Sequence, residues 1–417
     1  MPIQGIILKN QRLTLHDMNF GSNNTSSSDP LYLSPGQLGT LVVKNRLIRA
    51  ATSESMAHDD GSVSKELLDL YTDLARGGAG LLITGHMYVE ARGQYTPKQV
   101  GIHDDRNLSG LRRLAETVHE HDGKIFAELS HAGSQSDIPT VEPIAPSVIP
   151  NAIFSRVPQM MSTDDIHLTI DAFGQAARRA KGSGFDGIHI HSGNGYLLSE
   201  FNSPHANLRD DEWGGDVERR SRFLVSVYQR IRDEVGIDFP VTARIGMTDA
   251  VDKGLELGES LNRVETLFEL GLDGVEVSYG VMQSYLQNIR PYVGVTPRRA
   301  LEDGLIHRVF SRNEPEAYYR HFARAIKKTM NIPVILVGGI RTTDTMIDLL
   351  LSGDTDFIAM ARPFIREPDL PRKLAAGRTG IVDCVSCNIC LMHEGKDGLR
   401  CWRKTWGRLL YHAYCRF

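Results

Sequence analysis

Cysteine is scarce in this chain and is confined to one end. The 417 residues include five cysteines, and the first 383 residues contain none, so a disulfide framework is excluded for that part. Long apolar runs are also missing, because none approaches the roughly 20 residues that a membrane helix requires. The five cysteines are Cys384, Cys387, Cys390, Cys401 and Cys415.

Two further absences narrow the function. Residues 1–17 lack the basic, then apolar, then small-residue pattern of a secretory signal. The net charge is −4, whereas a nucleic-acid-binding surface needs an excess of basic residues. We therefore expect a cytoplasmic protein that acts on a small-molecule substrate and binds neither nucleic acid nor membrane. A homo-oligomer is compatible with this composition.

The chain does contain a regular alternation of strand and helix patterns. Short apolar segments that are typical of buried parallel strands alternate with longer amphipathic segments. Eight such repeats in 417 residues predict an α/β protein with a single (β/α)8 TIM barrel. The predicted strands are 46–53, 80–85, 124–130, 187–191, 241–245, 274–278, 333–337 and 357–361. The predicted helices are 65–76, 108–121, 162–181, 218–235, 259–270, 315–329, 342–351 and 369–376.

Composition divides the chain into three parts. Residues 1–40 read as an irregular lead-in that includes a polar, low-complexity stretch at 21–28. Residues 41–378 form the predicted barrel, which a Pro-rich insertion at 138–158 interrupts. Residues 379–417 form a short Cys-rich extension.

Polar side chains gather after the predicted strand 187–191, where barrels carry their chemistry. His191, Asn194 and Tyr196 follow one another within six residues, and Arg209 comes further on. A His and an Asn that point at one place can hold an oxygen and stabilise negative charge on it, and a Tyr can deliver a proton. Taken singly, each residue is better explained as a core His, a helix-capping Asn or a core Tyr.

The whole run is more specific than its parts and resembles the signature of the old yellow enzyme family. The matching residues are His191, Asn194, Tyr196-Leu197-Leu198, Phe201, Ser203-Pro204, Asn207, Arg209, Asp211, Gly214-Gly215, Glu218, Arg220 and Arg222-Phe223. The family consists of FMN-dependent ene-reductases and related oxidoreductases. The resemblance implies that His191 and Asn194 bind the electron-withdrawing group of the substrate and that Tyr196 donates the proton.

Two small-residue segments end the last two predicted strands and suggest a phosphate site. Gly338-Gly339 follows strand 333–337, and Ala361-Arg362 ends strand 357–361. Loops after strands seven and eight are the usual phosphate cradle of this barrel, although a glycine pair alone could form only a tight turn. The resemblance implies that these positions hold the FMN phosphate.

The resemblance also implies contacts with the flavin ring. Arg244, at the end of strand 241–245, would stabilise negative charge on reduced flavin; the alternative is a salt bridge at the barrel mouth. The segment Ala50-Ala51-Thr52-Ser53, at the end of the first strand, would lie beneath the ring. Ser53 stands where a Thr or Cys often touches the flavin O4.

Arg219 stands where the family usually has Asn and is expected to support the loop, and two positions at the flavin site also depart from the family pattern. Glu128 stands where the family has Gln, and an ionised Glu can accept a hydrogen bond from the flavin but cannot donate one. We therefore expect Glu128 to contact the flavin N3–H and to lower the flavin potential. His86, beside Gly85, replaces a Gly or Ala and should either narrow the pocket or contact the flavin through its backbone.

Four of the cysteines have the spacing of a metal site. Cys384-x2-Cys387-x2-Cys390-x10-Cys401 could wrap an iron–sulfur cluster, a zinc ion or nothing. Similar spacing occurs after the barrel in family members such as trimethylamine dehydrogenase, which carry a [4Fe-4S] cluster. Cys415 has no obvious partner.

Three functions remain open on this basis. The leading prediction is an enzyme, an FMN-dependent NAD(P)H oxidoreductase that reduces activated C=C bonds of enone-type substrates. One alternative is a flavin-dependent amine or N-methyl dehydrogenase that passes electrons to an iron–sulfur cluster, and another is a flavin or metal redox sensor. The loop with Tyr279, Met282 and Tyr285 is expected to line the substrate pocket, unless its side chains are simple packing.

Overall fold

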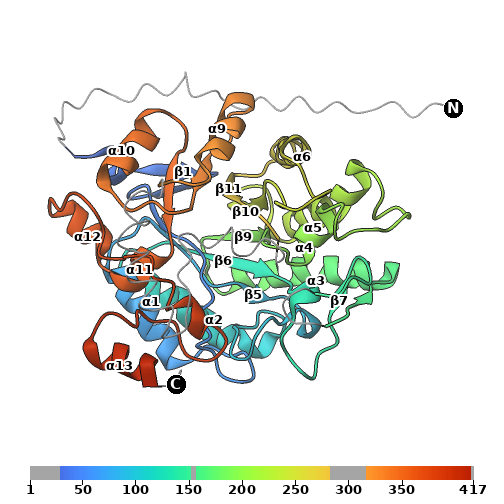
Figure 1. Ribbon diagram of the computed structural model, residues 1–417, viewed down its shortest axis with the longest axis horizontal. Coiled ribbons are helices and arrows are strands. Elements are labelled where there is room, and N and C mark those ends of the chain that lie inside the picture. The colour runs from blue at the N-terminus through green and yellow to red at the C-terminus, as the bar shows by residue number, and fades with distance from the viewer. Residues whose placement is uncertain (1–28, 152–155, 282–315, 415–417) are drawn as a thin grey trace.

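Eight parallel strands close into a barrel in the computed structural model, which describes residues 29–151, 156–281 and 316–414 (Figure 1). Each strand pairs with the next along the chain, the last pairs with the first, and the prediction of a single (β/α)8 barrel is confirmed. The strands are β3 (Leu47–Arg49), β4 (Leu81–Ile83), β6 (Ile125–Ser130), β9 (Gly187–Ser192), β10 (Val241–Gly246), β11 (Gly274–Ser278), β12 (Val334–Leu336) and β13 (Phe357–Met360).

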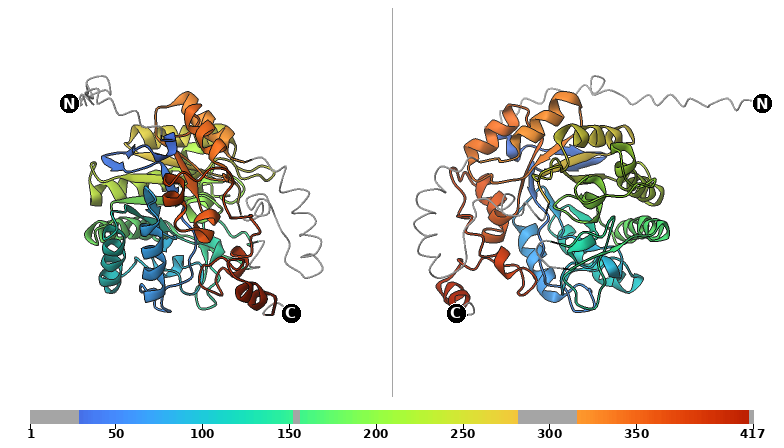
Figure 2. Two further views of the ribbon diagram at one scale, coloured as in Figure 1. Left: turned by 90° about the vertical axis from the view of Figure 1, so that its left-hand side faces the viewer. Right: turned by 45° about the vertical axis from the view of Figure 1, so that its right-hand side comes forward.

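The helices lie outside the strands, as both views of Figure 2 show. Their starts follow the sequence: Ser64 and Asp216 accept backbone N–H groups of the first turn, and Ser162 forms a capping box with Asp165. None of the helices in the described residues is long and apolar enough to cross a membrane. The principal helices are α1 (Lys65–Arg76), α2 (Leu108–His119), α3 (Thr163–Gly182), α5 (Val217–Val235), α6 (Leu257–Glu269), α9 (Arg320–Thr329), α10 (Thr343–Leu351) and α12 (Leu370–Ala375).

A hairpin that the sequence analysis did not predict closes the amino-terminal end of the barrel. A 3-10 helix (Leu31–Leu33) precedes β1 (Gly36–Leu38) and β2 (Leu41–Val43), which pair antiparallel. Leu38 and Val43 are fully buried against Phe357, at the start of β13. The described part of the expected irregular lead-in therefore contains regular structure that packs on the barrel.

Short elements build up the opposite end, where the strands finish. The two-residue strand β5 (Met87–Tyr88) adds to β6, and α4 (Leu197–Asn202) follows β9. The Pro-rich insertion at 138–158 contains β7 (Ile144–Ala145), which pairs with β8 (Gln159–Met160) directly after the insertion.

The Cys-rich extension lies on this same end of the barrel. After α11 (Arg362–Arg366) it contains a 3-10 helix (Leu391–His393) and α13 (Trp406–Tyr414). Two backbone N–H groups tie it to the segment after β3: Gly395 donates to Ser55 Oγ at 3.1 Å and Leu399 to Glu54 O at 2.9 Å. The extension is therefore part of the end that carries the strand-end loops.

We expect the hairpin to contribute measurably to stability. Val43 is fully buried whereas Val42, one residue earlier in β2, is 60% exposed. Val43→Ala should lower the free energy of unfolding by about 2 kcal/mol, because it removes buried methyl groups and leaves a cavity. Val42→Ala, the same change on the exposed face, should cost less than about 0.5 kcal/mol. Urea unfolding curves measure both, and equal costs would show that the hairpin does not pack on the barrel.

Candidate functional site

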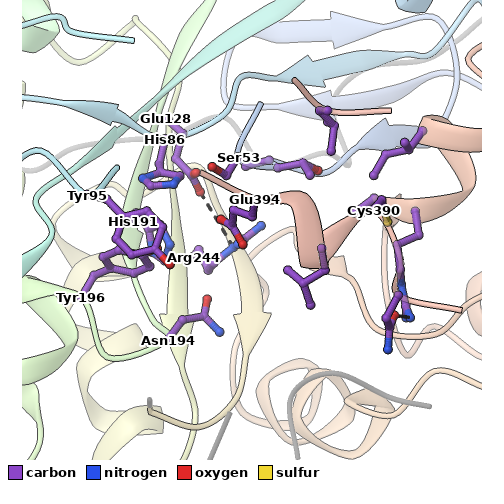
Figure 3. Close-up of a pocket in the computed structure, with 18 of the residues that line it drawn as sticks. Ser53, His86, Tyr95, Glu128, His191, Asn194, Tyr196, Arg244, Cys390 and Glu394 are labelled. Carbon is purple, nitrogen blue, oxygen red and sulfur yellow. Dashed lines mark hydrogen bonds and ion pairs between the residues drawn. The ribbon is translucent and has the colours of Figure 1, made fainter. Parts of the chain in front are cut away.

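A cavity of about 310 Å³ opens at the carboxyl ends of the strands. Four rings gather on one side of it, Cys390 lies on the opposite side, and Glu394 lies between them (Figure 3). The residues that line it are Ala51, Thr52, Ser53, His86, Tyr95, Glu128, His191, Asn194, Tyr196, Arg244, Val281, Ala361, Arg362, Ile365, Asn388, Cys390, Leu391, Glu394 and Leu399.

The three predicted catalytic side chains share this cavity. His191 belongs to β9, and Tyr196 directly precedes α4, with ring centroids 4.7 Å apart. Asn194 makes the turn between them with φ of +57°, a conformation that Asn tolerates better than most residues. Ser278 Oγ donates to Asn194 Oδ1 at 3.3 Å, which fixes the orientation of the amide.

His191 is neutral in this setting. Burial lowers its pKa well below the usual histidine value, and the charge of Arg244 acts in the same direction. Its Nδ1 is buried and has no hydrogen-bond partner within the described parts of the chain. The ring itself lines the cavity, where a neutral imidazole can form a hydrogen bond to a ligand.

Arg209 does not belong to the cavity, contrary to the expectation that it arrives with the other three. Its guanidinium pairs with Asp211 and donates to the carbonyl of Met161. Asn207 likewise donates to the backbone carbonyls of Phe201, in α4, and Trp213. These members of the motif hold the loop after β9 in shape, which explains why the motif is longer than the set of groups that face the cavity.

His86 faces the cavity with its side chain and narrows it. The ring lies 5.3 Å from Tyr196 and 5.6 Å from Tyr95, measured between centroids. Gln99 Nε2 lies 2.9 Å from His86 Nδ1 and, because an amide nitrogen can only donate, leaves the ring proton on Nε2. Burial lowers the pKa of His86 to about 4, and Arg244 acts in the same direction.

Gly85 lies behind the cavity and is absent from its lining. Its N–H donates to Glu54 Oε1 at 2.9 Å, and a Cβ at this position would come within 1.8 Å of Glu54 Oε2. Arg49 and Tyr71 bind the same carboxylate at 2.8 Å each. This buried network joins the segment after β3 to the segment after β4, so Gly85 has a positioning role here.

Arg244 lines the cavity and also forms the salt bridge that was the alternative explanation for it. Its Nη2 lies 2.6 Å from Glu276 Oε1. Burial alone would lower the pKa of Arg244, but Glu276 and Glu128 outweigh that effect and raise it. The guanidinium is therefore a permanent positive charge at the barrel mouth.

The expectation that Glu128 is ionised needs correction. Burial raises its pKa to about 8, and the charges of Glu276 and Glu54 add to that effect while Arg244 opposes it. Glu128 Oε1 is 3.9 Å from Arg244 and has no hydrogen-bond partner in the described residues. At neutral pH the carboxyl is mostly protonated, so Glu128 can donate as well as accept, as the Gln of the family does.

A second cavity of about 190 Å³ adjoins the first and suits a phosphate. Gly338 and Gly339 line it with φ of +116° and +75°, where tyrosine rings leave no room for a Cβ. Arg341 lines it as well, and its buried Nε has no partner among the described residues. Five residues line both cavities: Ala51, Asn194, Arg244, Ala361 and Arg362. Ala50 lines the second cavity but not the first.

The two joined cavities fit FMN. The larger one offers polar groups to a flat ring, and the smaller one offers glycine backbone and cationic side chains to a phosphate. Arg244 and Arg362 line both. The residues that were predicted from two distant parts of the sequence thus form one elongated site.

The four spaced cysteines surround a third cavity of about 140 Å³. No group of three or more His, Cys, Asp or Glu side chains in the described residues is arranged to hold a single metal ion. A cuboidal iron–sulfur cluster would be held by thiolates placed around a void. Cys390, Arg362, Ile365 and Asn388 line both this cavity and the main one.

Several lining residues were not predicted. Tyr95 precedes the third barrel strand in an irregular loop, and Asn388, Leu391, Glu394 and Leu399 belong to the extension. No local pattern marks them, because only the folded chain brings them to the barrel mouth. Tyr279 packs on Tyr319 and Phe322 and is absent from the cavity lining, contrary to expectation. Met282 and Tyr285, which were expected to line the pocket with it, lie outside the described residues.

A flavin-binding (β/α)8 oxidoreductase is the class of protein that this fold and site define. Residues 32–380 match the family model described as NADH:flavin oxidoreductase / NADH oxidase family. The chain belongs to this family of flavin-dependent oxidoreductases.

Individual relatives agree with this assignment. The NADH oxidase of Thermoanaerobacter brockii is 36% identical over 365 residues, covering 86% of this chain but 53% of the relative, so the chain spans about half its length. The NADPH dehydrogenase of Geobacillus sp. (strain WCH70) is 34% identical, with 82% of this chain and 93% of the relative covered. A solved old yellow enzyme homologue from Zymomonas mobilis has a TM-score of 0.69 at 26% identity, covering 85% of this chain and 95% of that one.

The protonation of Glu128 makes a prediction about stability. With a pKa of about 8 in the fold and about 4.5 when unfolded, Glu128 favours the folded state below pH 4.5 and loses that contribution as the pH rises through 8. Relative to Glu128→Gln, the wild-type apoprotein should therefore lose stability between about pH 5 and 9. Thermal unfolding of both proteins across this range gives the difference, and a difference independent of pH would mean that Glu128 is ionised throughout.

Proposed function

We propose that the protein is an FMN-dependent enzyme that uses NAD(P)H to reduce activated C=C bonds, as in enones. The observation that carries the proposal is the convergence of His191, Asn194 and Tyr196 on one cavity whose lining is continuous with a phosphate-sized one. Family membership supports a flavin as the cofactor. FMN, once reduced by NAD(P)H, supplies a hydride for the substrate.

The side chains of the cavity supply the remaining steps. His191 and Asn194 would hold the substrate oxygen and stabilise the charge that develops on it. Because His191 is neutral, it acts as a hydrogen-bond donor and leaves the proton transfer to another group. Tyr196 would give its Oη proton to the carbon next to the carbonyl, so that the C=C bond gains one hydride and one proton.

Other residues would bind and orient the cofactor. Gly338, Gly339 and Arg362 would hold the phosphate, and Arg244 would place its positive charge beside the ring. Ser53 and protonated Glu128 would face the polar edge of the ring with groups that both donate and accept. Four further predicted residues, Ala50, Ala51, Thr52 and Ala361, are small enough for a ring or phosphate to approach the backbone closely.

The first test is spectroscopic. Purified protein should show the yellow flavin spectrum, and anaerobic NADH or NADPH should bleach it. Addition of 2-cyclohexen-1-one should then restore the oxidised spectrum. Absence of a bound flavin, or flavin that neither nucleotide bleaches, would contradict the proposal.

Tyr196 provides a prediction for the second half of the reaction. Tyr196→Phe should slow reoxidation of the flavin by 2-cyclohexen-1-one about 100-fold or more, which is the usual contribution of a general acid. Reduction by NAD(P)H should be unchanged, because no proton from Tyr196 is needed there. Tyr95→Phe removes a neighbouring hydroxyl from the same cavity and should slow neither step more than a few-fold. Stopped-flow absorbance separates the two steps, and equal losses in both variants would refute the role of Tyr196.

A second candidate function is oxidation of an amine or N-methyl substrate with electrons leaving through an iron–sulfur cluster. The observation that favours it is the cavity between the four cysteines, since Cys390 lines both that cavity and the main one. A one-electron acceptor held there would be adjacent to the flavin site. Bleaching of the flavin by an amine, and not by NAD(P)H, would favour this function over the first.

The cluster itself can be tested without turnover. Cys387 lines the cysteine cavity but is absent from the lining of the main cavity. Cys387→Ala should therefore lower iron and acid-labile sulfide content while flavin content stays unchanged. Cys415 is outside the proposed ligand set, so Cys415→Ala should leave the iron, sulfide and flavin contents unchanged. Iron, sulfide and flavin analysis of anaerobically purified proteins decides the matter, and wild-type protein without iron would remove the cluster from the proposal.

A further inference from the structure

Glu394 is a carboxyl group of the main cavity to which the proposed reaction gives no task. It follows the 3-10 helix Leu391–His393 of the extension and reaches the barrel mouth beside Ser53 (Figure 3). Just after it in the chain, the N–H groups of Gly395 and Leu399 donate to Ser55 Oγ and Glu54 O. Its place in the cavity wall is therefore fixed by contacts between the extension and the barrel.

No cation of the described chain pairs with this carboxylate. The two arginines of the cavity have other partners: Arg244 lies 2.6 Å from Glu276, and Arg362 donates to Asn388 at 2.5 Å. Burial raises the pKa of Glu394 to about 7, and the contact with Ser53 is the one opposing influence. Glu394 is half-buried and lacks a counter-ion among the described residues, so a cation that enters the cavity would be stabilised by its carboxylate.

Aromatic rings in the same cavity favour a cation as well. His86, Tyr95, His191 and Tyr196 form a cluster with centroid distances between 4.7 and 6.1 Å. The faces of tyrosine rings attract ammonium groups. Glu394 and these rings therefore act in the same direction on a charged ligand.

We propose that Glu394 is a specificity-determining residue that makes the cavity prefer a substrate bearing a protonated amine over one bearing a carboxylate. The substrate oxygen lies at His191 and Asn194, and the amine lies at Glu394. This inference rests on the proposed reduction of activated C=C bonds and adds the chemical class of the substituent.

Three matched substrates separate charge from shape. They are 2-cyclohexen-1-ones that carry a methyl, an aminomethyl or a carboxylate group on ring carbon 5. With FMN-loaded protein at about pH 8, where Glu394 is mostly ionised, we expect the highest kcat/KM for the amine and the lowest for the carboxylate. Glu394→Gln keeps the size of the side chain and removes its charge. In this variant kcat/KM for the amine should fall about tenfold, and kcat/KM for the carboxylate should rise about tenfold. The value for the methyl compound should stay within about twofold of the wild type.

Asp397→Asn is the matched control for a charge change in the same loop. Asp397 bonds His393 at 2.7 Å and is absent from the cavity lining. This variant should keep the wild-type ranking of the three substrates. An unchanged ranking in Glu394→Gln, or equal losses for all three substrates, would overturn the role of Glu394.

A binding measurement keeps this test separate from the proposed reaction. The corresponding saturated cyclohexanones cannot be reduced, and their binding perturbs the flavin absorbance. If wild-type protein reduces none of the three enones, the proposed function fails, but the Kd values of the saturated compounds still report the charge preference. A wild-type preference for the amine that Glu394→Gln abolishes supports the inference, and equal Kd values for amine and carboxylate in the wild type overturn it.

Discussion

The buried ion pair between Arg244 and Glu276 is the interaction on which the site depends. A guanidinium removed from water without a partner would cost several kcal/mol. The register of the barrel supplies the partner, because Arg244 of β10 lies directly opposite Glu276 of β11. Burial lowers the pKa values of His86 and His191, and the charge of Arg244 adds to that effect. Arg244 also lines both the larger and the smaller cavity. Strand pairing thus fixes the position of a positive charge beside the groups that would face the substrate.

Much of the fold and part of the site could be predicted from local sequence. Buried parallel strands and amphipathic helices leave periodic patterns, so α1 and β11 were predicted with their observed bounds. The loop after β9 was also accessible, because His191, Asn194 and Tyr196 lie close together in the chain. The hairpin β1–β2 escaped notice because three-residue strands are too short to show a period.

The remaining features depend on contacts between distant parts of the chain. Residue type alone made Glu128 an ionised carboxylate, and its burial among Glu276 and Glu54 reverses that conclusion. Arg209 belongs to the motif yet points at Asp211, a distinction that a one-dimensional pattern does not contain. No sequence pattern marked Glu394 as a cavity residue, because it reaches the cavity through a contact with Ser53, which is far away in sequence.

The position of Arg362 has a consequence for how the protein can be dissected. This one side chain borders all three cavities, and its partner Asn388 lies between two of the cysteines. Residues up to 378 are consequently not enough to enclose the main cavity. Residues beyond 378 complete its wall, so a chain shortened at that point would leave the cavity open on one side.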